Sequence, residues 1–179
     1  MTQRMSVTFD VPEGVLSGRS GSLLNGVFEG IDFGVGQWRW EIGSGSHAGN
    51  HLYFASDCGT ARAFRFHPAP QQLISLRVFT GGRPGTLLLS DELGQTLVCW
   101  LRSGEPEVVT PDWPLPSTIV TVAFSGGWEL GLEGVTYETV PETAIHGRLV
   151  LEGGEAGRGR LTTAEGHALL RKLMERHSM

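Results

Sequence analysis

The sequence predicts an all-β protein, an antiparallel β-sandwich. The 179 residues include 26 Gly and 9 Pro but only 18% charged residues. That composition is typical of short strands joined by tight turns, and not of a helical bundle. About nine runs of alternating polar and apolar residues also follow one another at short spacing between residues 6 and 138.

The expected strands share this alternation and are bounded by Gly, Pro, Asn or Asp. They are residues 6–10, 31–33, 37–42, 52–55, 60–67, 73–80, 85–90, 96–102, 117–125 and 126–138. We expect residues 13–30 to form a long loop held down by its apolar side chains. Between two of the strands, Asp91 and Gly94 supply the turn chemistry of a hairpin.

The last strand is expected to lie centrally in a sheet. Its alternation places Trp128 and Leu130 on one face and Glu129 and Gly131 on the other. Gly134 then breaks the pattern, which predicts a β-bulge or a close approach of another backbone.

Beyond the sandwich, predicted for residues 1–138, the chain changes character. Residues 139–179 are predicted to form an extension with a strand at 148–152 and a Gly-rich linker at 153–159. A helix follows, opened by a capping box of Thr162 and Glu165. Its apolar stripe comprises Leu169, Leu170, Leu173 and Met174. A helix of about fourteen residues is marginal alone in water, so we expect it to dock on this sandwich or on a neighbour.

Charge and hydropathy exclude several classes of partner. The net charge is −5 and the 14 Lys and Arg form no run, so nucleic-acid binding is not expected. No apolar run reaches the roughly 18 residues of a membrane span, and the N-terminal residues lack the apolar core of a signal peptide. We therefore expect synthesis in the cytoplasm, with a particle-surface or extracellular location reached by lysis or through a signal that has been removed.

The chain has two cysteines, Cys58 and Cys99. Each lies in a strand-like run, which favours two thiols in the core, and a single disulfide bridge between them stays open.

The ordered stretches VTFD, EGIDFG, TLLLSDELGQTL and VVTPDWPLPSTIVTVAFSGGWELGLEGVTYE resemble a known module. They are similar to β-sandwich domains of the galactose-binding or carbohydrate-binding-module type found in bacterial secreted proteins, over residues 6–138, and this resemblance implies a sandwich of the jelly-roll kind. Those domains typically end in Trp-Asp-Leu-Gly-Ile-Asp-Asp followed by Ile or Val. In this chain Glu129 takes the first acidic position and Glu133 the next, whereas Gly134 replaces the last acid.

The resemblance implies that a structural calcium ion could be bound. Asp10, Asp32 and Glu133 are its candidate ligands, and loop carbonyl groups would have to supply most of the six to eight oxygens that calcium takes. The acid lost at Gly134 weakens this expectation. No other cofactor is expected.

Glycan binding requires an exposed aromatic ring surrounded by polar groups. Trp113 lies between prolines and is the best-placed tryptophan for exposure, with Arg83 and Arg102 in loops as hydrogen-bonding partners. The other tryptophans are predicted to be buried: Trp38, Trp40, Trp100 and Trp128.

Catalysis is not expected. Glu129 and Glu133 lie four residues apart on one strand, so their Cα atoms are separated by about 13 Å, which is too far for a retaining glycosidase. His47 and His51 share a loop but lack cysteine or helical partners for zinc.

Two functions fit these observations. The first is a non-catalytic structural or attachment subunit that assembles with itself or with other subunits, such as a decoration or tail protein of a phage-like particle. The second is a free carbohydrate-binding module that recognises a glycan through Trp113.

Overall fold

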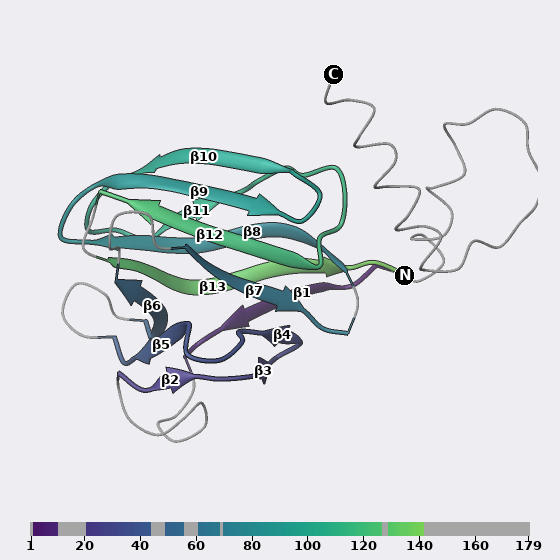
Figure 1. The fold of residues 1–179 in the computed structure, drawn as a ribbon, viewed down its shortest axis with the longest axis horizontal. Coiled ribbons are helices and arrows are strands. Elements are labelled where there is room, and N and C mark those ends of the chain that lie inside the picture. The colour runs from purple at the N-terminus through teal and green to yellow at the C-terminus, as the bar shows by residue number, and fades with distance from the viewer. Residues whose placement is uncertain are drawn as a thin grey trace, which may run out of the picture. The chain divides into compact units, whose positions relative to one another are not determined.

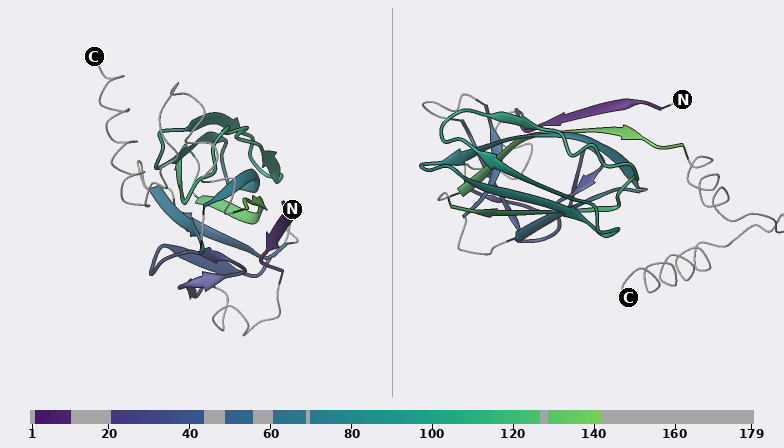
Figure 2. Two further views of the ribbon diagram at one scale, coloured as in Figure 1. Left: turned by 90° about the vertical axis from the view of Figure 1, so that its right-hand side faces the viewer. Right: turned by 90° about the horizontal axis from the view of Figure 1, so that it is seen from above.

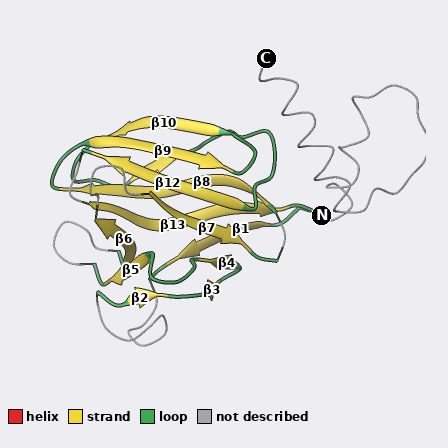
Figure 3. Ribbon diagram, viewed as in Figure 1, coloured by secondary structure: helices red, strands yellow, loops and turns green. Residues whose placement is uncertain are grey.

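The computed structural model describes residues 2–10, 21–43, 49–55, 61–68, 70–126 and 129–141. These residues form two antiparallel sheets enclosing one hydrophobic core, so the predicted antiparallel β-sandwich is confirmed (Figures 1 and 2). The described elements are strands joined by loops (Figure 3), and no helix among them is long and apolar enough to cross a membrane.

The chain divides into two compact units, residues 1–140 and 141–179. The strand expected at 148–152 and the helix carrying Leu169, Leu170, Leu173 and Met174 lie outside the described residues. Domain boundaries at 138 and the docking of that helix therefore stay predictions.

Thirteen strands are described. They are β1 Arg4–Thr8, β2 Leu23–Leu24, β3 Val27–Phe28, β4 Ile31–Asp32, β5 Trp38–Glu41, β6 His51–Ala55, β7 Ala61–Phe66, β8 Gln71–Gly81, β9 Gly85–Asp91, β10 Thr96–Leu101, β11 Glu107–Val109, β12 Ile119–Ser125 and β13 Glu129–Thr139. Three of these, β2, β3 and β11, fall where the alternation predicted no strand. Each has only two or three residues, which is too short for a period of two to be recognised.

The two sheets have the orders β11-β8-β13-β6-β5-β2, with β1 also paired to β13, and β10-β9-β12-β7-β4-β3. The long strand β13 is central, as expected, because it pairs with β8 on one side and with β6 and β1 on the other. Its pairing with β8 shifts register between Leu132 and Gly134, and a Cβ on Gly134 would lie 3.1 Å from the carbonyl oxygen of Val7. Both the bulge and the close backbone approach predicted at Gly134 are present.

Tryptophan side chains of β5 occupy the middle of the core. Trp38 and Trp40 are fully buried, as predicted. The indole N–H of Trp38 donates to the carbonyl of Ala63 in the other sheet at 3.0 Å, and that of Trp40 donates to the carbonyl of Phe9 at 3.2 Å. A buried indole is stable where its N–H finds an acceptor, so these bonds fix both rings.

The turn between β9 and β10 is fixed by one carboxylate. Asp91 Oδ1 accepts the N–H groups of Leu93 and Gln95 at 3.0 and 2.8 Å, and its Oδ2 accepts the hydroxyl of Ser117 at 2.8 Å. Gly94 adopts a φ of 81°, which a side chain would disfavour. The predicted hairpin turn is confirmed, and it holds β9 and β10 at the position where the candidate site lies.

Candidate functional site

The outer face of β9 and β10 carries large apolar side chains in contact with solvent. Along β10, Val98 is 64% exposed and Trp100 is 65% exposed, and Leu88 beside them on β9 is 38% exposed. The intervening residues Leu87 and Leu101 point inward and are buried. The strands therefore present apolar side chains on both faces, and only one of these faces is covered.

Register places the exposed side chains in rows across the sheet. Trp100 lies opposite Thr86, Val98 opposite Leu88, and Thr96 opposite Ser90. We call these six residues the β9–β10 platform. The next strand, β12, continues the rows with Ser125, Ala123 and Thr121. None of these nine side chains is charged, so the face combines one large indole, aliphatic groups and several hydroxyls.

Two exposed arginines lie at the end of the platform where Trp100 lies. Arg83 comes just before β9 and Arg102 just after β10. The hydroxyl of buried Thr80 donates to the carbonyl of Arg83 at 2.7 Å and lies 3.5 Å from the carbonyl of Arg102. Neither guanidinium forms an ion pair within the part of the chain that the structure describes. The structure thus brings together the two arginines that the sequence nominated, but beside a different tryptophan.

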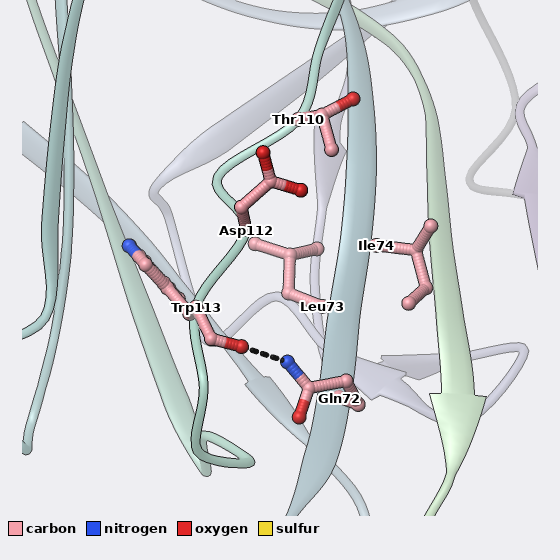
Figure 4. A pocket seen from close by; sticks show the side chains of 6 residues that line it. All are labelled: Gln72, Leu73, Ile74, Thr110, Asp112 and Trp113. Atoms are coloured by element: carbon pink, nitrogen blue, oxygen red, sulfur yellow. Dashed lines mark hydrogen bonds between the residues drawn. The ribbon is translucent and has the colours of Figure 1, made fainter.

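Trp113 does not provide an exposed ring. It is 5% exposed and belongs to the hydrophobic core, so the expected exposure is wrong. The backbone N–H groups of Gln71 and Ser117 each donate to the carbonyl of the other residue at 2.9 Å. These bonds hold the segment that carries Trp113 against β8, with the indole inside. Trp113 also borders a hollow of about 290 Å³, where the Gln72 amide donates to its carbonyl (Figure 4). The remaining lining residues are Leu73, Ile74, Thr110 and Asp112.

Trp100 was expected to be buried, and that prediction is also wrong. The run from Thr96 to Leu101 is apolar at five of its six positions, so alternation alone does not say which side is the core. The sequence does contain one signal for the solvent side. Side chains at every second position of a strand share a face, so Val98 and Trp100 share theirs with polar Thr96 before them and Arg102 after them. The polar residues at both ends indicate that this face meets solvent.

The three carboxylates nominated for calcium are engaged by protein donors. Asp10 accepts the N–H of Asn50 at 2.8 Å, and Asp32 on β4 accepts the N–H of Gly34 at 2.9 Å. Glu133 pairs with Arg77 at 2.6 Å. Asp10 and Glu133 both come near Gly49, but the described residues contain no group of three acidic, histidine or cysteine side chains arranged to hold a metal ion.

The outer face of the other sheet is also aromatic, but its rings are used in packing. Phe79 is 2% exposed although it lies outside the core cluster, and the ring of His51 meets it edge-on at 4.7 Å. Burial, together with the nearby carboxylate of Glu41, raises the pKa of the Tyr53 phenol. His51 is itself buried and its Nδ1 lies 3.2 Å from the carbonyl of Gly49, whereas His47 lies outside the described residues.

The remaining expectations concern the cysteines. Cys99 is a free, half-buried thiol on the inward side of β10, and burial raises its pKa. This agrees with a core thiol. Cys58 and Trp128 lie outside the described residues.

The different settings of the buried tryptophans give a testable contrast. The indole N–H of Trp113 is buried without a hydrogen-bond partner among the described residues, whereas that of Trp40 donates to Phe9. We expect Trp40→Phe to lower the free energy of unfolding by about 1–2 kcal/mol more than Trp113→Phe, because only the first leaves a buried carbonyl unpaired. Urea denaturation followed by circular dichroism measures both, and equal losses would contradict the expectation.

Fold and platform together define the molecule as a β-sandwich domain with an open, uncharged sheet face that displays one exposed indole. No family model matches the chain, and no curated protein matches it.

Similar solved structures are family 29 carbohydrate-binding modules, which belong to the class of sandwich that the sequence resembles. CBM29_1 from Piromyces equi is 15% identical, with 78% of this chain and 91% of that chain covered at a TM-score of 0.45. A CBM29-2 mutant complexed with cellulohexaose is 10% identical, with 77% and 92% covered at 0.46. Another CBM29-2 mutant, complexed with mannohexaose, is 9% identical, with 78% and 93% covered at 0.46. Likenesses this distant carry no inference about the ligand of this chain, which is argued below from its own side chains.

Proposed function

We propose that this protein is a non-catalytic carbohydrate-binding module whose β9–β10 platform contacts the glycan. The observation that carries the proposal is the indole of Trp100, 65% exposed on an open sheet face. Together with exposed Val98 and Leu88 on the same face, this indole forms a contiguous apolar patch, and such patches typically mark interaction sites. This is the second of the two functions that the sequence allowed. No observation on the described residues supports the particle-subunit role.

The platform's chemistry suits a sugar ring. The C–H face of a pyranose is apolar and packs on an indole, while its hydroxyls need donors and acceptors at the edges. Thr86 lies directly opposite Trp100, and Thr96 and Ser90 form the third row. The exposed guanidinium groups of Arg83 and Arg102 add donors at the Trp100 end. One stacking surface bordered by hydroxyl and guanidinium groups is therefore available within a single face.

Charge selects among glycans. The platform carries no charged side chain, and the whole chain has a net charge of −5. The guanidinium groups of Arg83 and Arg102 would attract an acidic sugar at short range, whereas the net charge of −5 repels a polyanion as a whole. We infer that the ligand is a neutral polysaccharide. An extracellular or particle-surface location agrees with such a ligand and stays a prediction.

Affinity electrophoresis through gels containing soluble neutral polysaccharides (hydroxyethylcellulose, xylan, glucomannan, galactan) tests this function, with polygalacturonate as the acidic comparison. We expect retardation by at least one neutral polymer and none by polygalacturonate. N-bromosuccinimide oxidation with peptide mapping then locates the contact, because accessible indoles react first. Bound polysaccharide should protect Trp100 specifically. Binding without protection of Trp100 would place the site elsewhere, and no retardation by any neutral polymer would overturn the proposed function.

A further inference from the structure

The two sheets end in strands of very different character. In the seven-stranded sheet the path ends at β11 and β2, which have three and two residues, and the six-stranded sheet ends at β3 with two. The side strand β1 is longer, but it begins at Arg4, whose guanidinium pairs with Glu138 at 2.8 Å. Short length and charge are the means by which sandwiches prevent their edges from pairing with other chains.

Strand β10 lacks both protections. It runs for six residues, Thr96–Leu101, pairs with β9 alone among the described strands, and forms the outer strand of its sheet (Figure 1). Its sequence TLVCWL contains no charge and no proline, and its register with β9 is continuous, with no bulge. Just beyond its end, the carboxylate of Glu107 accepts the N–H of Arg102 at 2.7 Å. Among the described residues no other strand pairs with the rest of this edge, so its backbone donors and acceptors can pair with an added strand.

The side chains of β10 are also incompletely covered on both faces. Val98 and Trp100 are exposed on the outer side, and Leu97 and Cys99 are only partly buried on the inner side, against the core. A strand added beside β10 would flank all four at the edge of the sheet, and the outer face above Val98 and Trp100 would stay open to a glycan. Such a strand must itself be uncharged and apolar on both faces, because it would meet apolar neighbours on both sides of the sheet.

We propose that β10 pairs with β10 of a second copy of this chain, giving a two-fold symmetric dimer with one continuous sheet. A second copy supplies an uncharged strand with apolar side chains on both faces. A two-fold axis perpendicular to the sheet places β10 of one copy beside β10 of the other in antiparallel orientation. The proposal concerns the edge of the sheet, and it does not depend on glycan binding.

The proposed dimer has its two-fold axis at Val98. Residues opposite each other in an antiparallel pair point to the same face of the sheet. Each even-numbered residue of β10 must therefore lie opposite an even-numbered residue of the second copy, and each odd-numbered residue opposite an odd-numbered one. An axis at Val98 places Val98 opposite Val98 of the second copy and Trp100 opposite its Thr96. Aromatic side chains opposite β-branched ones are favourable cross-strand pairs. On the inner face this register covers Cys99 with Leu97 of the second copy.

Light scattering coupled to size-exclusion chromatography tests the proposal across protein concentrations, without any glycan. The full chain is expected at twice the 19.4-kDa chain mass. Val98→Lys and Val98→Glu each place two like charges at the axis and should each give monomers. Their equimolar mixture should recover the dimer mass, because lysine then faces glutamate. A native protein that stays monomeric at every concentration would overturn the proposal.

Val108→Lys is the matched control. Val108 lies on the edge strand β11 and is 65% exposed, against 64% for Val98, so the two substitutions add the same charge at equal exposure. The control is expected to stay dimeric. Dissociation by both lysine variants would show a charge effect unrelated to β10 and would also overturn the proposal. Far-ultraviolet circular dichroism checks that all variants are folded, as exposed positions should allow.

Discussion

Trp100→Ala is expected to lower the affinity for a neutral polysaccharide by about 30- to 150-fold. Trp100 is 65% exposed in the free protein, and covering that surface contributes roughly 2–3 kcal/mol to binding. The same exposure means that few packing contacts are lost, so the free energy of unfolding should change by less than about 1 kcal/mol. Isothermal titration calorimetry with the polysaccharide identified by the gel screen measures the affinity.

A matched control separates stacking from general loss of apolar surface. Val108 is 65% exposed, on β11 of the other sheet, so Val108→Ala removes exposed apolar surface away from the platform and should leave affinity unchanged. Trp100→Tyr and Trp100→Phe keep a smaller ring and should fall between Trp100 and Ala. If Trp100→Ala binds as tightly as the native protein, the platform is not the glycan site.

Gly131→Ala is expected to be the most destabilising single-methyl substitution at the centre of β13, with a loss of about 2–3 kcal/mol and a fall in Tm of about 5–10 °C. A Cβ at Gly131 would overlap the ring of Phe79, which lies on that face of the sheet. The ring cannot shift freely, because it is 2% exposed and packs edge-on against His51. Thermal unfolding followed by circular dichroism measures the change.

Two further variants make this prediction specific. A Cβ on Gly49 would find its nearest neighbours, the Glu133 and Asp10 carboxylate oxygens, at 3.7 and 3.8 Å, so Gly49→Ala should change stability little. Phe79→Leu shortens the obstructing side chain. In that background Gly131→Ala should cost at least 1 kcal/mol less than in the native protein, as a double-mutant cycle would measure. Equal costs in both backgrounds would show that the Phe79 ring is not the obstacle.

The sequence predicts burial correctly where polar and apolar residues alternate regularly along a strand. Trp38 and Trp40 share a face with polar residues between them, so the alternation identified them as core. It failed at Trp100 and Trp113 for two different reasons. Around Trp100 both faces of the strand are apolar, and around Trp113 there is no strand period to interpret. The arginines of the candidate site were identified, but the aromatic residue between them was not.

The sequence alone determined the class of fold, the turn at Asp91 and Gly94 and the bulge at Gly134, because each depends on residues adjacent in the chain. Only the tertiary structure decided which faces and edges meet solvent. Trp100 is exposed because β10 ends its sheet with one face uncovered, and Trp113 is buried because Gln71 and Ser117, 46 positions apart in the chain, bond to each other. Exposure depends on contacts between distant segments, and a local period carries no information about those contacts.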